Sequence, residues 1–127
     1  MTSGTLSWVL AAHDPNQLAG FYAALFGVEQ HQGFSASHRY LDLEGALRLE
    51  IYRPSSRRPF PARGRCLAPC LRLSPDPQPL DQLMRQLPAW LAIGATVVEP
   101  ARLEPFGAEV WLGDPEGNPV LVMQPFV

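Results

Sequence analysis

Residues 47–52, Leu-Arg-Leu-Glu-Ile-Tyr, alternate apolar side chains with charged and polar ones. A β-strand turns successive side chains to opposite faces, so Arg48, Glu50 and Tyr52 share the polar face. Parity with the other expected strands adds Val9, Ala11 and Arg72 to this face. Two kinds of chemistry follow for Arg48 and Arg72 near Glu50. They form an ion-pair network within the protein, or one guanidinium holds the carboxylate or phosphate of a small ligand.

Side chains for nucleophilic catalysis are not arranged in a motif. The serines lack a Gly-x-Ser-x-Gly elbow, and no histidine lies in a motif that places it beside a serine or cysteine. His13 stands at an expected helix start, as a surface or capping residue. His31 and His38 stand near strand ends, either exposed in loops or at the mouth of a binding cleft. Cys66 and Cys70, spaced C-x3-C without a second pair, are expected to be reduced thiols.

Composition limits the classes of partner. A chain of 127 residues with 46% hydrophobic residues is expected to form one globular domain. The formal charge of −2 provides no basic field for nucleic acid or an anionic membrane. The first residues lack a basic region followed by an apolar one, and no apolar run approaches the roughly 18 residues of a membrane span. We therefore expect a cytoplasmic protein with neither nucleic-acid nor membrane partners.

The first half of the chain reads as a strand, a helix and three strands. A strand over residues 5–12 precedes a helix in which Asp14 is the N-cap, Pro15 the first residue and Gly27 the terminating residue. Apolar residues at helical spacing support it: Leu18, Phe21, Tyr22 and Leu25. Strands are expected near 28–34, 38–43 and 46–52, with a turn at Glu44-Gly45. Residues 53–68, with five arginines and no periodicity, form a linker, or a basic segment for an anionic ligand or partner.

The second half repeats this order. A strand over 69–74 precedes a helix marked by Leu80, Leu83, Met84 and Leu87, which Pro88 is expected to bend or end. Residues 94–100 form a strand. Two further strands flank the strongest turn signal of the chain, Asp114-Pro115-Glu116-Gly117-Asn118.

The repeat predicts the fold class. We expect one α+β domain over residues 1–127, made of a βαβββ module at 5–52, a linker at 53–68 and a βαβββ module at 69–126. Each module alone leaves apolar surface uncovered, so two mixed sheets should together form a cleft with the helices on the convex side. Trp8, opposite in parity to Ser7, should pack beneath the helices, whereas Phe106 and Trp111 either wall the cleft or fill the core.

This arrangement resembles the vicinal oxygen chelate superfamily, which includes glyoxalase I, bleomycin and fosfomycin resistance proteins and extradiol dioxygenases. The resemblance rests on three motifs and covers residues 5–124. They are Phe21-Tyr22-x-x-Leu25-Phe26-Gly27, Gly94-Ala95-x-Val97-Val98 and Asp114-Pro115-Glu116-Gly117-Asn118. It implies the glyoxalase-like fold, but these motifs are helix, turn and packing signals that do not specify a reaction.

Enzymes of the superfamily bind a divalent metal with His, Gln or Glu side chains from strands one, four, five and eight. The resemblance maps these positions to Ser7, Glu50, Cys70 and Leu121. Only Glu50 matches, and one carboxylate with one thiol is a poor site for a hard cation. We therefore expect neither a metal nor another cofactor, with Glu50 as the best catalytic candidate if there is catalysis. The expected ligand-binding cleft consists of Ser7, Val9, Arg48, Glu50, Tyr52, Cys70, Arg72, Trp111 and Leu121.

Three functions remain open at this point. The first is a metal-free protein that binds or sequesters a small aromatic or anionic molecule. The second is a metal-dependent lyase, isomerase or dioxygenase with a rearranged site around Glu50, Cys70 and one histidine. The third is a structural or regulatory protein without a ligand. The resemblance also implies a homodimer, either side by side or with exchanged modules.

Overall fold

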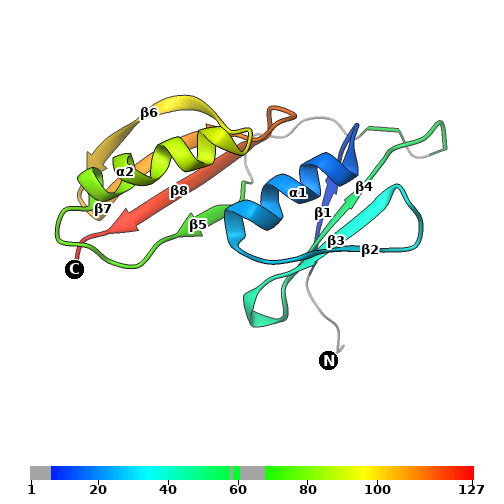
Figure 1. The fold of residues 1–127 in the computed structure, drawn as a ribbon, viewed down its shortest axis with the longest axis horizontal. Coiled ribbons are helices and arrows are strands. Elements are labelled where there is room, and N and C mark those ends of the chain that lie inside the picture. The colour runs from blue at the N-terminus through cyan, green and yellow to red at the C-terminus, as the bar shows by residue number, and fades with distance from the viewer. Residues whose placement is uncertain (1–6, 58, 61–67) are drawn as a thin grey trace. The chain divides into compact units, whose positions relative to one another are not determined.

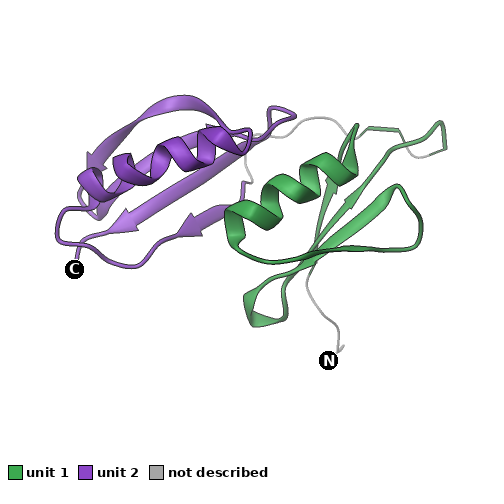
Figure 2. Ribbon diagram, in the orientation of Figure 1, with its two compact units in different colours: residues 1–63 green, residues 64–127 purple. Residues whose placement is uncertain are grey.

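The chain folds into two compact units, residues 1–63 and 64–127, which are described separately (Figure 2). The computed structural model describes residues 7–57, 59–60 and 68–127. Cys66 and half of the expected linker lie outside these residues. None of the described helices is long and apolar enough to cross a membrane.

Unit 1 is a four-stranded mixed sheet with one long helix, α1 (Figure 1). The strand order is β1-β4-β3-β2, with β1 parallel to β4 and the other pairs antiparallel. A short 3-10 turn, Glu44–Ala46, joins β3 to β4. The elements are β1 (Ser7–Ala11), α1 (Pro15–Phe26), β2 (Gln30–Gln32), β3 (His38–Asp42) and β4 (Arg48–Tyr52).

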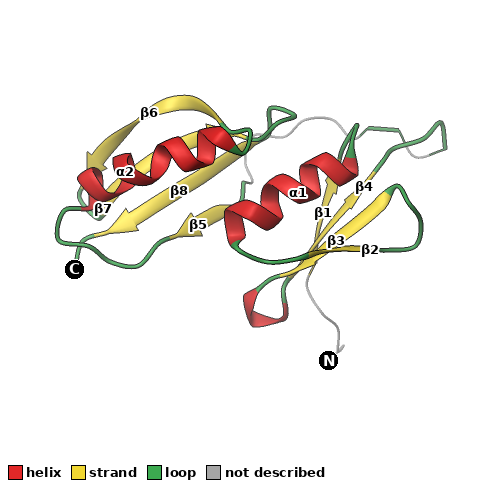
Figure 3. Ribbon diagram, in the orientation of Figure 1, coloured by secondary structure: helices red, strands yellow, loops and turns green. Residues whose placement is uncertain are grey.

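Unit 2 repeats this topology, with strand order β5-β8-β7-β6 and the parallel pair β5 and β8 (Figure 3). Its elements are β5 (Cys70–Arg72), α2 (Pro79–Ala92), β6 (Thr96–Glu104), β7 (Gly107–Gly113) and β8 (Pro119–Pro125). The predicted α+β class with two βαβββ modules is confirmed.

Helix α1 begins and ends where its sequence predicts. The Asp14 carboxylate accepts a hydrogen bond from the Gln17 N–H at 3.1 Å, and Pro15 occupies the first turn. Gly27 ends the helix in the left-handed conformation, with φ of 69°. The buried face packs on one side of the sheet, where the fully buried side chains include Leu18, Tyr22, Leu41 and Ile51.

Helix α2 excludes one of the two alternatives predicted for Pro88, that the proline ends the helix. The helix continues through Pro88 to Ala92, so the proline does not end it. Pro88 is exposed. Because proline has no N–H, the carbonyl group four residues earlier lacks its helical hydrogen bond, and water can bond it on this side of the helix. Leu83 and Trp90 are buried on either side of Pro88 and hold the helix on the sheet, whereas Met84, expected on the apolar face, is half exposed.

Several strand limits also differ from the predicted ones. Strand β6 continues past Pro100 to Glu104, with irregular pairing between Val97 and Arg102. It is an edge strand, where a proline removes no ladder hydrogen bond if its nitrogen faces outward. Strand β4 begins at Arg48 and not at residue 46, because Ala46 adopts a φ of 62° in the turn.

The turn between β7 and β8 is organised by Asp114, which is only 2% exposed. Its Oδ1 accepts hydrogen bonds from the backbone N–H groups of Glu116 and Asn118, at 2.8 and 2.9 Å. Its Oδ2 accepts a hydrogen bond from the Asn118 side-chain amide at 2.7 Å. The aspartate is therefore the buried acceptor that closes this turn, as the Asp-Pro-Glu-Gly-Asn signal predicts.

Replacing Asp114 by alanine should lower the free energy of unfolding by roughly 2–3 kcal/mol, because three donors lose a charged acceptor. Urea denaturation monitored by circular dichroism measures this change. Asp114→Asn keeps one acceptor oxygen and should cost less. Equal losses in the two variants would contradict the role assigned to the carboxylate.

Candidate functional site

The helix-free face of the unit 1 sheet carries the residues that parity predicted there. Val9 pairs with Glu50, and Ser7 pairs with Arg48, on the neighbouring strands β1 and β4. Their neighbours Leu49 and Ile51 are buried on the opposite face, so Glu50 and Tyr52 point away from the core. Ser7 and Val9 are exposed, and Arg48, Glu50 and Tyr52 are half-buried.

Strand β3 adds an ion pair and a ring to this face. Asp42 lies opposite Arg48, and its Oδ1 accepts a hydrogen bond from the Arg48 Nε at 2.9 Å. The Arg48 guanidinium also lies over the ring of Tyr40, with its Cζ 4.0 Å from the centroid. Of the two alternatives for Arg48, a pairing within the protein is the one seen, but its partners are Asp42 and Tyr40 and not Glu50. Arg72 belongs to unit 2.

The partner of Glu50 is His38, which the sequence placed only near a strand end. The Nε2 of His38 lies 3.3 Å from Glu50 Oε1. The backbone N–H of Phe34 donates to His38 Nδ1 at 3.0 Å. Because Nδ1 is an acceptor, the neutral ring carries its proton on Nε2, beside the carboxylate. The neutral imidazole therefore carries its N–H on the nitrogen that lies 3.3 Å from Glu50 Oε1.

A short loop holds His38 in this position. A Cβ atom added to Gly33 would overlap with Nδ1 and Cε1 of the His38 ring, so the ring packs where only glycine fits. The Phe34 ring stacks on the imidazole, with centroids 5.5 Å apart. Backbone bonds join Gly33 N to His38 O and His38 N to Ser35 O. The signal for this arrangement was present in the sequence as Gly33-Phe34 four to five residues before a histidine.

Two hollows adjoin this face, and Glu50 lines both. The first has a volume of about 480 Å³, with an apolar side formed by Val9 and Phe34. Its further lining residues are Ser35, Ser37, His38, Glu50, Tyr52, Arg53 and Ser55. The second, of about 490 Å³, is lined by Ser7, Asp42, Leu43, Ala46, Leu47, Arg48 and Glu50. Val9 is 64% exposed and Phe34 is 98% exposed, so the first hollow offers open apolar surface.

In unit 2, the remaining predicted site residues share the helix-free face of the second sheet. Cys70 and Trp111 both pair with Leu121, and Arg72 pairs with Met123. The residues that alternate with these are buried with α2 and include Val110, Val120 and Val122. Cys70 and Arg72 are exposed, whereas Trp111 and Leu121 are half-buried. Phe106 lies in the β6–β7 turn and is 44% exposed, so it is not a core residue.

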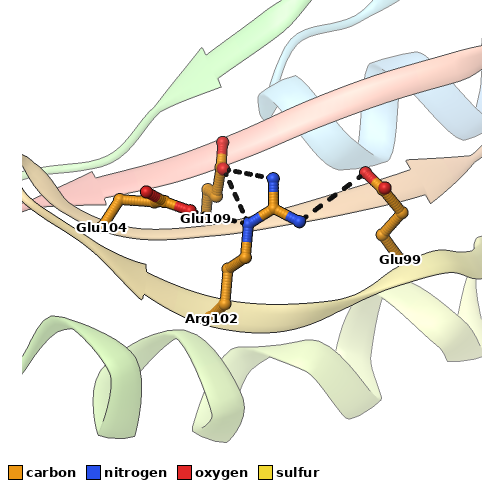
Figure 4. Close-up of polar contacts among 4 residues, drawn as sticks. All are labelled: Glu99, Arg102, Glu104 and Glu109. Atoms are coloured by element: carbon orange, nitrogen blue, oxygen red, sulfur yellow. Dashed lines mark hydrogen bonds and ion pairs between the residues drawn. The ribbon is translucent and has the colours of Figure 1, made fainter.

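The same face holds a charge cluster that sequence reasoning missed. Arg102 binds Glu109 Oε1 through Nε at 3.1 Å and Nη2 at 2.9 Å, and binds Glu104 Oε1 at 2.8 Å (Figure 4). Glu99 Oε2 lies 4.0 Å from Arg102 Nη1. Glu109 is only 8% exposed, so Arg102 replaces much of the solvent that its carboxylate loses on burial. The hydrogen bond with Glu109 is the largest cause of a raised pKa at Arg102.

Cys70 does not offer a reactive thiolate. Although the residue is exposed as a whole, partial desolvation of the thiol raises its pKa, and Glu109 raises it further, against a lowering by Arg72. A thiol with a raised pKa is protonated at neutral pH and is a weaker nucleophile and metal ligand than a thiolate.

The donor set does not fit a family-type metal centre. Among the described residues, no three His, Cys, Asp or Glu side chains lie together as ligands. The mapped positions supply a hydroxyl at Ser7, a carboxylate at Glu50, a protonated thiol at Cys70 and an alkyl group at Leu121. His38 is the nearest additional donor, but its Nδ1 accepts from Phe34 and its Nε2 carries the proton.

The other two histidines contact aromatic rings. His13 is exposed, and its ring lies 4.3 Å from that of Phe60, centroid to centroid. His31 is exposed and its ring lies 5.1 Å from that of Tyr40. The expectation that His13 is a surface residue agrees with its exposure.

A family model described as a glyoxalase-like domain matches residues 7–123. The chain belongs to the glyoxalase-like domain family. This match and the similar solved structures confirm the resemblance to the vicinal oxygen chelate superfamily. A comparison with curated proteins found no match.

Three solved structures illustrate the shared fold. A glyoxalase/bleomycin resistance protein from Albidiferax ferrireducens is 21% identical, with 96% of this chain and 98% of that chain covered and a TM-score of 0.66. A lactoylglutathione lyase from Agrobacterium tumefaciens is 22% identical, with 97% and 94% covered and a TM-score of 0.60. The fosfomycin resistance protein FosX from Listeria monocytogenes, complexed with Mn(II) and 1S,2S-dihydroxypropylphosphonic acid, is 15% identical, with 100% and 94% covered and a TM-score of 0.70.

Replacing Gly33 by alanine should displace the His38 ring, because the new methyl group overlaps with it. The imidazole 15N signals of His38 in long-range spectra should no longer show the tautomer with its proton on Nε2. The free energy of unfolding should fall by roughly 1–3 kcal/mol. Gly20→Ala, in α1, is the matched control and should leave the His38 signals unchanged. Unaltered His38 signals in Gly33→Ala would refute this packing.

Replacing Arg102 by glutamine should destabilise the protein, because Glu109 then remains buried without a cation. The double variant Arg102→Gln, Glu109→Gln should recover part of the loss. A double-mutant cycle measures this coupling, from thermal unfolding of the wild type, both single variants and the double variant. Additive effects of the two substitutions would show that there is no coupling energy between Arg102 and Glu109.

Proposed function

We propose that this glyoxalase-like protein binds a small organic molecule, without a metal, in the first hollow of unit 1. The observation that carries the proposal is the combination of exposed apolar Val9 and Phe34 with the His38–Glu50 pair in one hollow. Small-molecule sites are mainly apolar, with a few polar groups that fix the orientation of the ligand. The volume of about 480 Å³ lies within the range of such sites.

The metal-free character is supported by the donor chemistry. Glu50 is the one mapped position with a hard anionic donor, and the proton on His38 Nε2 occupies the space beside its Oε1. A divalent ion held by Glu50 alone would keep most of its water ligands and bind weakly.

A metal-dependent lyase, isomerase or dioxygenase is the second candidate, favoured by the proximity of His38 to Glu50. A ring that exchanged its tautomer would turn the Nε2 lone pair toward the carboxylate, at the cost of the Phe34 hydrogen bond. Such a site would combine one imidazole with one carboxylate and would need ligands from elsewhere.

Metal content separates the two candidates. Protein purified without chelator should carry less than one transition-metal ion per chain by native mass spectrometry, and EDTA should leave its melting temperature unchanged. A stoichiometric ion, together with a lower melting temperature after chelation, would overturn the metal-free proposal in favour of the second candidate.

Ligand binding at the hollow is tested with a library of small aromatic molecules, monitored by 1H-15N chemical shifts. We expect shifts at Val9 and Phe34, and Phe34→Ala should weaken binding about tenfold or less, as expected for loss of one exposed ring contact. The matched control is Phe126→Ala, which removes an exposed ring from unit 2. Equal effects of the two substitutions would contradict the proposed site.

A further inference from the structure

The charges around the first hollow of unit 1 define the kind of ligand that fits it. We infer that the ligand carries a positively charged N–H donor, such as an ammonium, amidinium or guanidinium group, attached to a flat apolar part. This inference rests on the proposed function, because it names the chemistry of a molecule in the same hollow. It replaces the anionic ligand considered from the sequence with a cationic one at this position.

The first argument is that the basic side chain expected to hold an anion is already engaged. Arg48 donates to Asp42 at 2.9 Å and lies over Tyr40. It also lines the second hollow and not the first. An anion would have to compete with the Asp42 carboxylate for this guanidinium, so Arg48 contributes little to anion binding in the first hollow.

The second argument is that Glu50 remains the acceptor in the hollow. Only its Oε1 faces His38, and none of the described residues hydrogen-bonds its Oε2. The Phe34 N–H occupies the lone pair of His38 Nδ1, so in the neutral tautomer the ring carries its N–H on Nε2, the nitrogen nearest to Glu50. The Glu50 side chain is 28% exposed, which leaves it accessible while reducing solvent screening.

Arg53 is the opposing charge in the lining of the hollow. It is exposed, so water and salt screen its guanidinium more effectively than they screen the half-buried Glu50. The charge that is better placed to select a ligand is therefore the carboxylate.

The third argument concerns the apolar part of the ligand. The Phe34 ring stacks on His38 on one side and is 98% exposed overall, which leaves ring surface to contact a ligand. Val9 pairs with Glu50 across β1 and β4 and is 64% exposed. An acceptor flanked by an aromatic ring and an aliphatic side chain fits a cation joined to a planar apolar group.

Three probes of nearly equal shape test the inference: benzamidinium, benzamide and benzoate. They share one ring and differ in the charge of the head group. Titration of each into the full-length protein, followed by 1H-15N shifts of Val9, Phe34 and Glu50, gives three dissociation constants. We expect benzamidinium to bind at least about tenfold more tightly than the other two, as expected for one charge-assisted hydrogen bond.

Two carboxylate variants identify the acceptor. Glu50→Gln keeps the shape of the side chain and should abolish the preference for benzamidinium. Glu44→Gln removes an exposed carboxylate from the β3–β4 turn, outside both hollows, and should retain the preference. Circular dichroism melting curves check that both variants fold, and the ranking of the probes on the wild type tests the inference without any variant.

Each outcome has a distinct meaning. A benzamidinium preference that is lost in Glu50→Gln and kept in Glu44→Gln supports the inference. Equal or tighter binding of benzamide or benzoate would overturn the cationic ligand and leave the proposed function standing. A preference that survives Glu50→Gln would overturn the role of this carboxylate. If none of the three probes shifts the residues of the hollow, the proposed binding function itself fails.

Discussion

The burial of one face of each sheet under a single helix is the constraint on which the rest of the structure depends. In unit 1, α1 covers Leu41 and Ile51, so the residues that alternate with the buried ones along β3 and β4 must point away from the core. A register slip by one residue would bury Glu50 and expose Ile51. The positions of the polar side chains are thus fixed by hydrophobic burial, and not by their contacts with one another.

This constraint explains what could be predicted from the sequence. The period-two pattern of residues 47–52 was sufficient to put Glu50 on the helix-free face, and Asp14 and Gly27 were sufficient to bound α1. The limits of β6 and the course of α2 were not predictable in the same way. There, tertiary packing by Leu83 and Trp90 outweighs the cost of Pro88, and an edge position tolerates Pro100.

The sequence predicted which face of the sheet carries the candidate site, but not which side chains pair with one another on it. Cross-strand neighbours depend on the register between β3 and β4, which sets Asp42 opposite Arg48 and Tyr40 opposite Glu50. A single sequence shows which side chains of one strand share a face, but it does not show which residues of the neighbouring strand lie opposite them. The Arg48–Asp42 and His38–Glu50 pairs follow from that register, and neither partner could be chosen from the sequence alone.

Glu50 lines both hollows of unit 1, which has a consequence for thermodynamic linkage. One carboxylate cannot give its full charge to two cations at once, so a cation bound in either hollow reduces the affinity of the other. By reciprocity the reduction is the same in both directions. If the proposed cation binds, the two hollows would compete for this one carboxylate, and occupation of either would lower the affinity of the other.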